Sequence, residues 1–307
     1  MYSLLSDLAP AQKLLIPHLM PNFFSNIICI STLCLLIGGC STSDSPVSVT
    51  AMTFNIRWDN PNDGVDGWDL RKDWVSDVII ESGAEIIGLQ EALLHQIAHL
   101  DSSSAGFDWI GVGRDDGKTQ GELSPILFDT TKWTVLEWDT RWLSSTPDSV
   151  GVAGWDAALP RIATIATLQH VKTQFELRVI NTHFDHRGET ARLESAKLIR
   201  DWALEGNKPV LVLGDFNFKQ HEPPYAALTD TVADRFLRDA GTGDTTSTFK
   251  GFDALKPVSG ARIDYVLSAG HQGPDQNGQY ATYSVIESIR SDRFVSDHLP
   301  VLSTLRY

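Results

Sequence analysis

The stretch VLVLGDFN, residues 210–217, joins four consecutive apolar residues to a polar end that contains Asp215 and Asn217. A continuous apolar run of this length is typical of a strand buried on both faces. Side chains two residues apart in extended backbone share a face, so Asp215 and Asn217 can act together at the end of the strand. The stretch therefore predicts a central strand that carries an acid and an amide to the rim of a sheet.

Five other segments repeat this arrangement of an apolar strand with polar side chains at one end. They are TFNIR at residues 53–57, IGLQE at 87–91, VINTHFDH at 179–186, RIDYVL at 262–267 and SDHLPV at 296–301. Each one alone is a weak signal, because a single Gly-Asp-x-Asn is more often a turn and a single Ser-Asp-His suits a helix cap equally well. Six such segments in one chain predict that several strand ends present polar groups at the sheet rim.

The spacing of apolar residues elsewhere predicts both strands and helices. Further strand patterns cover residues 49–56, 85–89, 125–128 and 299–305, and segments 161–171 and 175–182 predict a hairpin. Two helices are expected, one with Leu70, Trp74, Val78 and Ile79 on one face, capped by Asp69 and stopped by Gly83, and one with Leu193, Ala196, Ile199 and Ala203, ending at Gly206. Hairpin-like pairs outnumber βαβ units. The predicted fold class is therefore α/β (α+β), a four-layer sandwich of two mostly antiparallel β-sheets packed face to face with helices outside.

The charge balance limits the classes of function. The chain carries 25 Lys+Arg and 39 Asp+Glu, a formal charge of −14, and 42% of its 307 residues are hydrophobic. This composition excludes a wholly disordered chain. The acid excess argues against a broad nucleic-acid clamp, which needs a basic face. It leaves room for a local phosphate site and suits a chain that gathers carboxylates around a cation.

The first 40 residues predict export. Residues 27–39 form an uncharged run of 13 residues, which is shorter than the roughly 20 that a membrane-spanning helix needs but suits the core of a signal peptide. The run ends in two glycines before Cys40, and a polar Ser/Thr/Pro linker follows. This pattern resembles a bacterial lipoprotein signal in which Cys40 is lipidated. The alternative is a buried apolar segment of the fold.

The expected organisation is a signal peptide at residues 1–39, a linker at 40–47 and one folded domain at 48–307. Residues 1–19 can be a start-site error, because Met20 offers a second start and the nearest base to the apolar run is Lys13. All three cysteines, Cys29, Cys34 and Cys40, fall in the first 40 residues, which excludes disulfides, four-cysteine zinc sites and a cysteine nucleophile from the folded part. The protein is expected to be exported and lipid-anchored to a bacterial membrane, in the periplasm or at the cell surface.

Together, the six segments resemble the endonuclease/exonuclease/phosphatase superfamily of metal-dependent hydrolases. That group includes DNase I, apurinic endonucleases, neutral sphingomyelinases, inositol-polyphosphate 5-phosphatases and deadenylases. The resemblance covers residues 47–307 and makes the domain at 48–307 the expected catalytic domain. It is specific for the superfamily and far less specific for the substrate.

The resemblance implies a site for one hard divalent cation. It makes Glu91 the first-choice ligand, with Asn55 supplying an amide oxygen nearby and Asp297 reaching the metal directly or through water. Mg²⁺ favours such oxygen ligands and is usually held by one or two carboxylates plus phosphate oxygens, so Mg²⁺ is the expected cofactor and Mn²⁺ a substitute. The chain has no HExxH spacing, which argues against a zinc protease.

The resemblance also assigns the groups that act on the phosphate. Asp215 orients or deprotonates the attacking water, and Asn217 holds water or phosphate. Asp264 fixes the tautomer of His298, which then binds a non-bridging phosphate oxygen or protonates the leaving group. His183 is a second phosphate-facing imidazole.

The roles of four more residues stay open. Arg114 lies in the turn-rich segment 111–117, where a cation could clamp phosphate or simply be solvated. Other branches of the superfamily carry an acid where Arg57 stands, so we expect a single essential metal. The roles of Asp185 and His186 stay open, because strand alternation turns one residue of each adjacent pair away from the rim and His186 equally suits a loop.

The predicted reaction is hydrolysis of a phosphate ester, as a phosphodiesterase or a phosphomonoesterase, by in-line attack of an activated water. An extracellular DNA or RNA nuclease is the first alternative, and a catalytically silent binding module on the same fold is the second. Counterion release on nucleic acid needs clustered Lys and Arg, and the sequence shows no such cluster. A small phosphate ester is therefore the expected partner, and the protein is expected to be a monomer.

Overall fold

The computed structural model describes residues 46–230, 236–256, 260–270 and 281–307. The predicted signal peptide and Cys40 lie outside these residues, as does most of the predicted linker, so export and lipidation stay predictions. In the part that is described, no helix combines the length and apolar character needed to cross a membrane.

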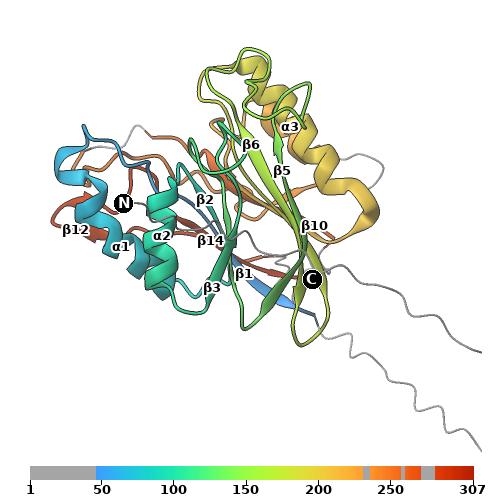
Figure 1. Ribbon diagram of the computed structural model, residues 1–307, viewed down its shortest axis with the longest axis horizontal. Helices are drawn as coiled ribbons and strands as arrows, with labels where there is room; N and C mark the ends of the chain where they lie inside the picture. The colour runs from blue at the N-terminus through green and yellow to red at the C-terminus, as the bar shows by residue number, and fades with distance from the viewer. Residues whose placement is uncertain (1–45, 231–235, 257–259, 271–280) are drawn as a thin grey trace, which may run out of the picture. The chain divides into compact units, whose positions relative to one another are not determined.

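Two six-stranded sheets form the centre of the fold (Figure 1). The first sheet has the order β11 (Ser284–Val285), β14 (Val301–Arg306), β1 (Ser48–Asn55), β2 (Ile86–Gln90), β4 (Ile126–Asp129) and β3 (Phe107–Ile110). The second has the order β5 (Trp133–Trp142), β6 (Ile162–His170), β7 (Glu176–His183), β8 (Val210–Asp215), β10 (Asp264–Ala269) and β9 (Arg238–Asp239). Strands β12 (Ile289–Arg290) and β13 (Arg293–Phe294) form a separate short hairpin.

The predicted fold class is confirmed. Each sheet has one parallel pair, β1–β2 in the first and β7–β8 in the second, and its other pairings are antiparallel. The predicted hairpin is the antiparallel pair β6–β7. The inner faces bury aliphatic side chains from both sheets, among them Val49, Ile86, Leu177, Leu211 and Leu213.

Helices cover the outer face of each sheet and complete the four layers (Figure 1). They are α1 (Trp68–Glu81) and α2 (Leu94–Ser103) on the first sheet, α3 (Glu189–Leu204) and α4 (Pro223–Thr229) on the second, and the short 3-10 turns η1 (Gly64–Asp66) and η2 (Glu205–Asn207). One apolar cluster joins Ile79 and Ile97 to Leu89 of β2, and another joins Ile199 to Val212 of β8. The central strands β2, β8 and β10 are therefore buried on both faces.

The predicted inner face of α1 is wrong at one position. Leu70 is 73% exposed, whereas Trp68, Arg71, Trp74 and Val75 are buried. The helix begins at Trp68 with Gly67 as its N-cap, so Asp69 lies in the first turn and does not cap the helix. The two tryptophans fix which side of the helix is buried, and this rotation leaves Leu70 in solvent.

Strand register gathers the predicted polar residues at one edge. In the second sheet His183 is paired with Asp215, and Asp215 is paired with Asp264. In the first sheet Asn55 is paired with Gln90, which places Glu91 one residue beyond. Within each sheet, strand pairing thus brings the polar residues to one edge.

A buried polar contact fixes how the two sheets sit against each other. The Asn181 side chain of β7 crosses the interface, accepting a hydrogen bond from Gln90 Nε2 at 2.7 Å and donating to the backbone oxygen of Leu89 at 2.7 Å. Gly88 makes room for this crossing, because a Cβ there would lie 2.4 Å from Asn181 Oδ1. The absence of a side chain at Gly88 therefore sets the relative position of the two halves of the site.

Candidate active site

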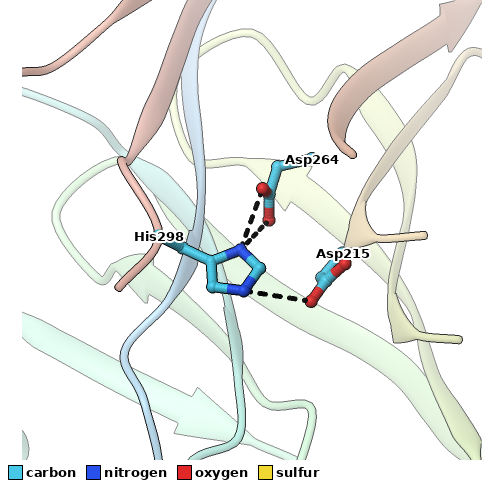
Figure 2. A group of neighbouring side chains, drawn as sticks. All are labelled: Asp215, Asp264 and His298. Carbon is cyan, nitrogen blue, oxygen red and sulfur yellow. Dashed lines mark hydrogen bonds and ion pairs between the residues drawn. The ribbon is translucent and has the colours of Figure 1, made fainter. Parts of the chain in front are cut away.

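His298 lies between two carboxylates of the second sheet (Figure 2). Its Nδ1 is 3.0 Å from Asp264 Oδ2, and its Nε2 is 3.7 Å from Asp215 Oδ2. All three side chains are at most 4% exposed. Asp264 thus contacts the Nδ1 edge of the His298 ring, and Asp215, which lines the cavity, lies at the Nε2 edge.

Burial and charge set the protonation of this group. Burial lowers the pKa of His298, but the carboxylates of Asp264 and Asp215 outweigh it and hold the pKa well above the usual value for histidine. Burial raises the pKa of Asp215 to about 7, and the positive charge of His298 limits that rise. The pair therefore combines an imidazolium with a carboxylate that exchanges its proton near neutrality.

Asn55 connects the two sheets at the site. Its Nδ2 donates to Glu91 Oε1 and to Asp215 Oδ2, both at 3.1 Å, and its Oδ1 accepts the backbone N–H of Arg57 at 3.0 Å. The amide therefore orients two carboxylates in this structure, while its predicted contact with metal stays a prediction. The backbone N–H of Trp58 donates to Glu91 Oε2 at 3.1 Å and fixes the other carboxylate oxygen.

Glu91 and Asp297 supply donors that fit a divalent cation. Both carboxylates line the same cavity. Burial raises the pKa of Asp297, and the negative charge of Glu91 raises it further, against the opposing charges of His298 and Arg57. A bound cation would remove this repulsion, and hard oxygen donors suit Mg²⁺. Asp215, Asp264 and His298 also have ligand atoms within 4.8 Å of one another, but the contact between His298 and Asp264 already uses His298 Nδ1.

Arg57 lines the cavity, and its guanidinium is paired with two carboxylates. Its guanidinium donates two hydrogen bonds of 3.0 Å to Asp63 and lies 3.5 Å from Asp297 Oδ2. Buried Arg71 and Gln96 both donate to the Arg57 backbone oxygen. A positive charge thus lies beside Asp297, and the number of metal ions stays a prediction.

His183 and Asn217 contact each other next to Asp215. Asn217 Nδ2 donates to His183 Nε2 at 3.1 Å and to the Phe184 backbone oxygen at 3.1 Å. Burial, followed by the charges of Arg161 and Arg114, lowers the pKa of His183 well below its usual value, so the ring is neutral. His183 positions Asn217 in this arrangement, and its direct contact with phosphate stays a prediction.

A cavity of about 350 Å³ opens over these groups. Six of the nine predicted site residues line it, namely Glu91, His183, Asp215, Asn217, Asp297 and His298. Asn55 and Asp264 are almost fully buried and reach the cavity through the residues that they orient. The cavity therefore gathers carboxylates suited to a divalent cation, a candidate base and an imidazolium around one space.

Arg114 is not among the residues that line the cavity. Its Nη1 donates to Glu122 Oε2 at 2.7 Å, and Glu122 lines the cavity in its place. Burial raises the pKa of Glu122, while the charge of Arg114 opposes that rise. The side chain expected to clamp phosphate is thus paired with an acid in this structure.

Sequence reasoning missed several residues of the cavity wall. Glu122 and Arg161 line it, as do the apolar side chains of Leu159 and Phe249. Arg161 stands immediately before the apolar strand β6, the same signal that marked the other site segments. The apolar residues lie outside regular strands, where sequence spacing carries no information about their direction.

The similarity to known proteins agrees with this geometry. A family model described as Endonuclease/Exonuclease/phosphatase family matches residues 52–298, a range that includes all nine predicted site residues. The chain therefore belongs to the endonuclease/exonuclease/phosphatase family. This membership supports phosphate ester hydrolysis as the class of activity. No curated protein matches the chain.

Three solved structures from Bacteroides resemble the chain over nearly their whole length. A family protein from Bacteroides thetaiotaomicron is 34% identical with a TM-score of 0.75, covering 86% of this chain and 99% of that protein. One from Bacteroides vulgatus is 35% identical with a TM-score of 0.74, covering 84% and 98%. A mannosyl-6-phosphatase from Bacteroides thetaiotaomicron is 32% identical with a TM-score of 0.72, covering 84% and 99%.

Proposed function

We propose that the protein is a metal-dependent hydrolase of small phosphate esters, and of monoesters in particular. The observation that carries this proposal is buried Asp215 in the cavity wall, in contact with Asn55 and within 3.7 Å of both His183 and His298. The similarity to a mannosyl-6-phosphatase supports a monoester substrate. The formal charge of −14 supports a small substrate over a long polyanion.

Two hydrogen bonds fix the carboxylate that acts on water in this proposal. Asp215 Oδ1 accepts the backbone N–H of Asn217 and its Oδ2 accepts the Asn55 amide, so the carboxylate is fixed before water arrives. Asp215 removes a proton from a water molecule, whose oxygen attacks phosphorus in line while the bond between phosphorus and the ester oxygen breaks. The imidazolium of His298, held by Asp264, stabilises negative charge on a phosphoryl oxygen or gives its proton to the leaving oxygen.

Glu91 and Asp297 would hold one Mg²⁺, with Mn²⁺ as a substitute. When bound, the cation neutralises charge on the phosphate and the leaving oxygen. Positioning and electrostatics supply most of the rate acceleration in this scheme, because no covalent bond forms between protein and substrate.

We also infer that the protein is exported, anchored through lipidated Cys40 and monomeric. The support for export and for the anchor is the 13-residue apolar run before Cys40 in the sequence. Metabolic labelling with palmitate in a bacterial host should mark the wild-type protein and leave Cys40→Ser unlabelled. Equal labelling of both proteins would contradict the anchor, and light scattering of the purified domain tests its monomeric state.

The catalytic proposal is tested with four substrates side by side in the presence of Mg²⁺ or Mn²⁺. They are p-nitrophenyl phosphate, bis-p-nitrophenyl phosphate, plasmid DNA and sphingomyelin. We expect the fastest turnover on the monoester. The variant Asp215→Asn should fold normally by circular dichroism and lose about 10³-fold or more in kcat.

The results separate the alternatives. Turnover of plasmid DNA above that of both small esters would favour the nuclease. A folded protein that cleaves none of the four substrates with either metal would favour the silent binding module. Wild-type turnover by Asp215→Asn would remove Asp215 from its proposed role.

A further inference from the structure

Asp185, Arg161 and His186 form a chain of polar contacts that the proposed mechanism does not use. Arg161 Nε is 3.4 Å from Asp185 Oδ2, and Arg161 Nη2 donates to His186 Nδ1 at 3.0 Å. Arg161 and His186 both line the cavity. Asp185 and His186 belong to the segment VINTHFDH, in which the sequence could not assign them a role.

Asp185 anchors this chain of contacts. Its carboxylate is 1% exposed and accepts the backbone N–H groups of Ala158, Arg187 and Gly188 at 2.8–3.1 Å. Burial raises the pKa of Asp185, but these donors and Arg161 together lower it to about 2. The acid therefore ties the loop before β6 to the loop after β7 and fixes the place of Arg161.

One N–H group of the Arg161 guanidinium makes no hydrogen bond to the described residues. The side chain is 4% exposed, Nε faces Asp185 and Nη2 faces His186, while buried Nη1 has no hydrogen-bond partner among the described residues. A buried unpaired guanidinium N–H costs free energy, which an anionic oxygen in the cavity would recover. Arg57, the other arginine that lines the cavity, is already paired with Asp63.

The contact with Arg161 fixes the tautomer of His186. A guanidinium only donates, so His186 Nδ1 accepts and the proton of the neutral ring lies on Nε2. His186 is exposed, whereas Asp215 and His298 are 1% and 4% exposed. Since the reacting phosphorus must lie near Asp215, the exposed His186 faces a more distant part of the substrate.

We propose that Arg161 and His186 form a specificity subsite for a polyhydroxylated phosphate monoester of the hexose phosphate class. Arg161 Nη1 binds a phosphoryl oxygen, and His186 Nε2 donates a hydrogen bond to a hydroxyl or ring oxygen of the sugar. The apolar side chains of Trp58, Leu159 and Phe249 line the same cavity and offer surface to a sugar ring. This subsite rests on the proposed phosphatase function and adds the chemistry of the leaving alcohol to it.

The test compares two monoesters that differ in the alcohol. Hexose 6-phosphates, of glucose and mannose, carry hydroxyls, whereas p-nitrophenyl phosphate carries none. We expect His186→Ala to lower kcat/KM on a hexose 6-phosphate by about tenfold or more, mainly through KM, and on p-nitrophenyl phosphate by less than about threefold. His186→Gln, which keeps an N–H donor, should recover part of the loss.

Two further variants sharpen the comparison. Arg161→Gln should lower kcat/KM on both monoesters, because both present the same phosphate. Arg187→Ala alters an exposed neighbour of His186 that does not line the cavity, and it should change neither substrate. An equal loss on both monoesters in His186→Ala, or no loss on the hexose 6-phosphate, would overturn the subsite.

Failure of the subsite and failure of the proposed function give different results. Cleavage of p-nitrophenyl phosphate without cleavage of either hexose 6-phosphate leaves the phosphatase in place and overturns the subsite. If the wild type cleaves neither, the phosphatase proposal fails. The subsite is then decided by titration calorimetry of mannose 6-phosphate into Asp215→Asn and Asp215→Asn/His186→Ala, where weaker binding by the double variant supports it and equal binding overturns it.

Discussion

Burial of Asp215 favours its protonated form, whereas the proposed reaction needs the ionised carboxylate. Burial raises its pKa to about 7, so the folded protein without metal keeps the Asp215 proton up to that pH, whereas the unfolded chain releases it near pH 4. At Asp215 the folded state therefore binds more protons between these values, and the contribution of this residue to stability falls as pH rises from about 4 to 7.

Asp215→Asn should remove that loss, because an amide does not ionise. Without divalent metal, we expect the variant to be more stable than the wild type at pH 8, by on the order of 1 kcal/mol, and about equally stable at pH 4. Urea denaturation in buffer that contains EDTA, at pH 4 and at pH 8, measures the difference in the free energy of unfolding. A variant that is less stable than the wild type at pH 8 would show that Asp215 stabilises the fold in its ionised form.

Asp264 should act through His298. Asp264→Asn removes the charge that raises the pKa of His298 and loosens the orientation of the ring. We expect kcat to fall by about 10² or more while KM changes little, and the imidazole pKa measured by NMR to fall. An unchanged imidazole pKa, or a loss confined to KM, would argue that Asp264 supports only the local structure.

The sequence indicated the acids, amides and imidazoles at strand ends because strand pairing decides their positions. Asp215, Asp264 and His183 are brought into one row by register. Arg114 and Arg161 show the limit of this reasoning. Each has acids within reach in the folded chain, and only the structure shows that Arg114 is paired with Glu122 while Arg161 faces the cavity.

The strands were more predictable than the helices. The apolar run of β8 and the hairpin β6–β7 follow from patterns that extend over several residues. The buried face of α1 depends on where the helix begins and on two large tryptophans, and a pattern of four apolar residues misplaces Leu70. Helix rotation is decided by packing against the sheet, which no local pattern contains.

Gly88 of β2 should tolerate no larger residue. A Cβ at this position would lie 2.4 Å from Asn181 Oδ1 and 2.9 Å from Leu213 Cβ. We expect Gly88→Ala to lower the free energy of unfolding by about 1–3 kcal/mol and to reduce activity, because the two sheets must shift apart.

Gly67→Ala is the matched control. Gly67 precedes α1 with an ordinary φ of −57°, and a Cβ there meets one backbone oxygen at 3.2 Å. We expect this variant to cost less than about 1 kcal/mol. Equal destabilisation of the two variants in urea would contradict the steric account of Gly88.

Metal should stabilise the protein as well as activate it. The carboxylates of Glu91 and Asp297 lie in one cavity within a chain of net charge −14. EDTA should abolish activity reversibly, and added Mg²⁺ should raise Tm, because a ligand that binds only the folded state stabilises it. Glu91→Gln should weaken this response of Tm to Mg²⁺, and KCl at matched ionic strength controls for screening. Full activity in metal-free buffer would exclude the metal requirement.

The contact between Asn181 and Gln90 joins two sheets that each carry only part of the site. The groups of the site come from both sheets, Asn55 and Glu91 from one and His183, Asp215 and Asp264 from the other. When the two sheets separate on heating, neither sheet keeps the complete set of these groups. Each molecule is therefore expected to be either fully active or inactive, so the residual activity of a heated sample should report the fraction of intact molecules.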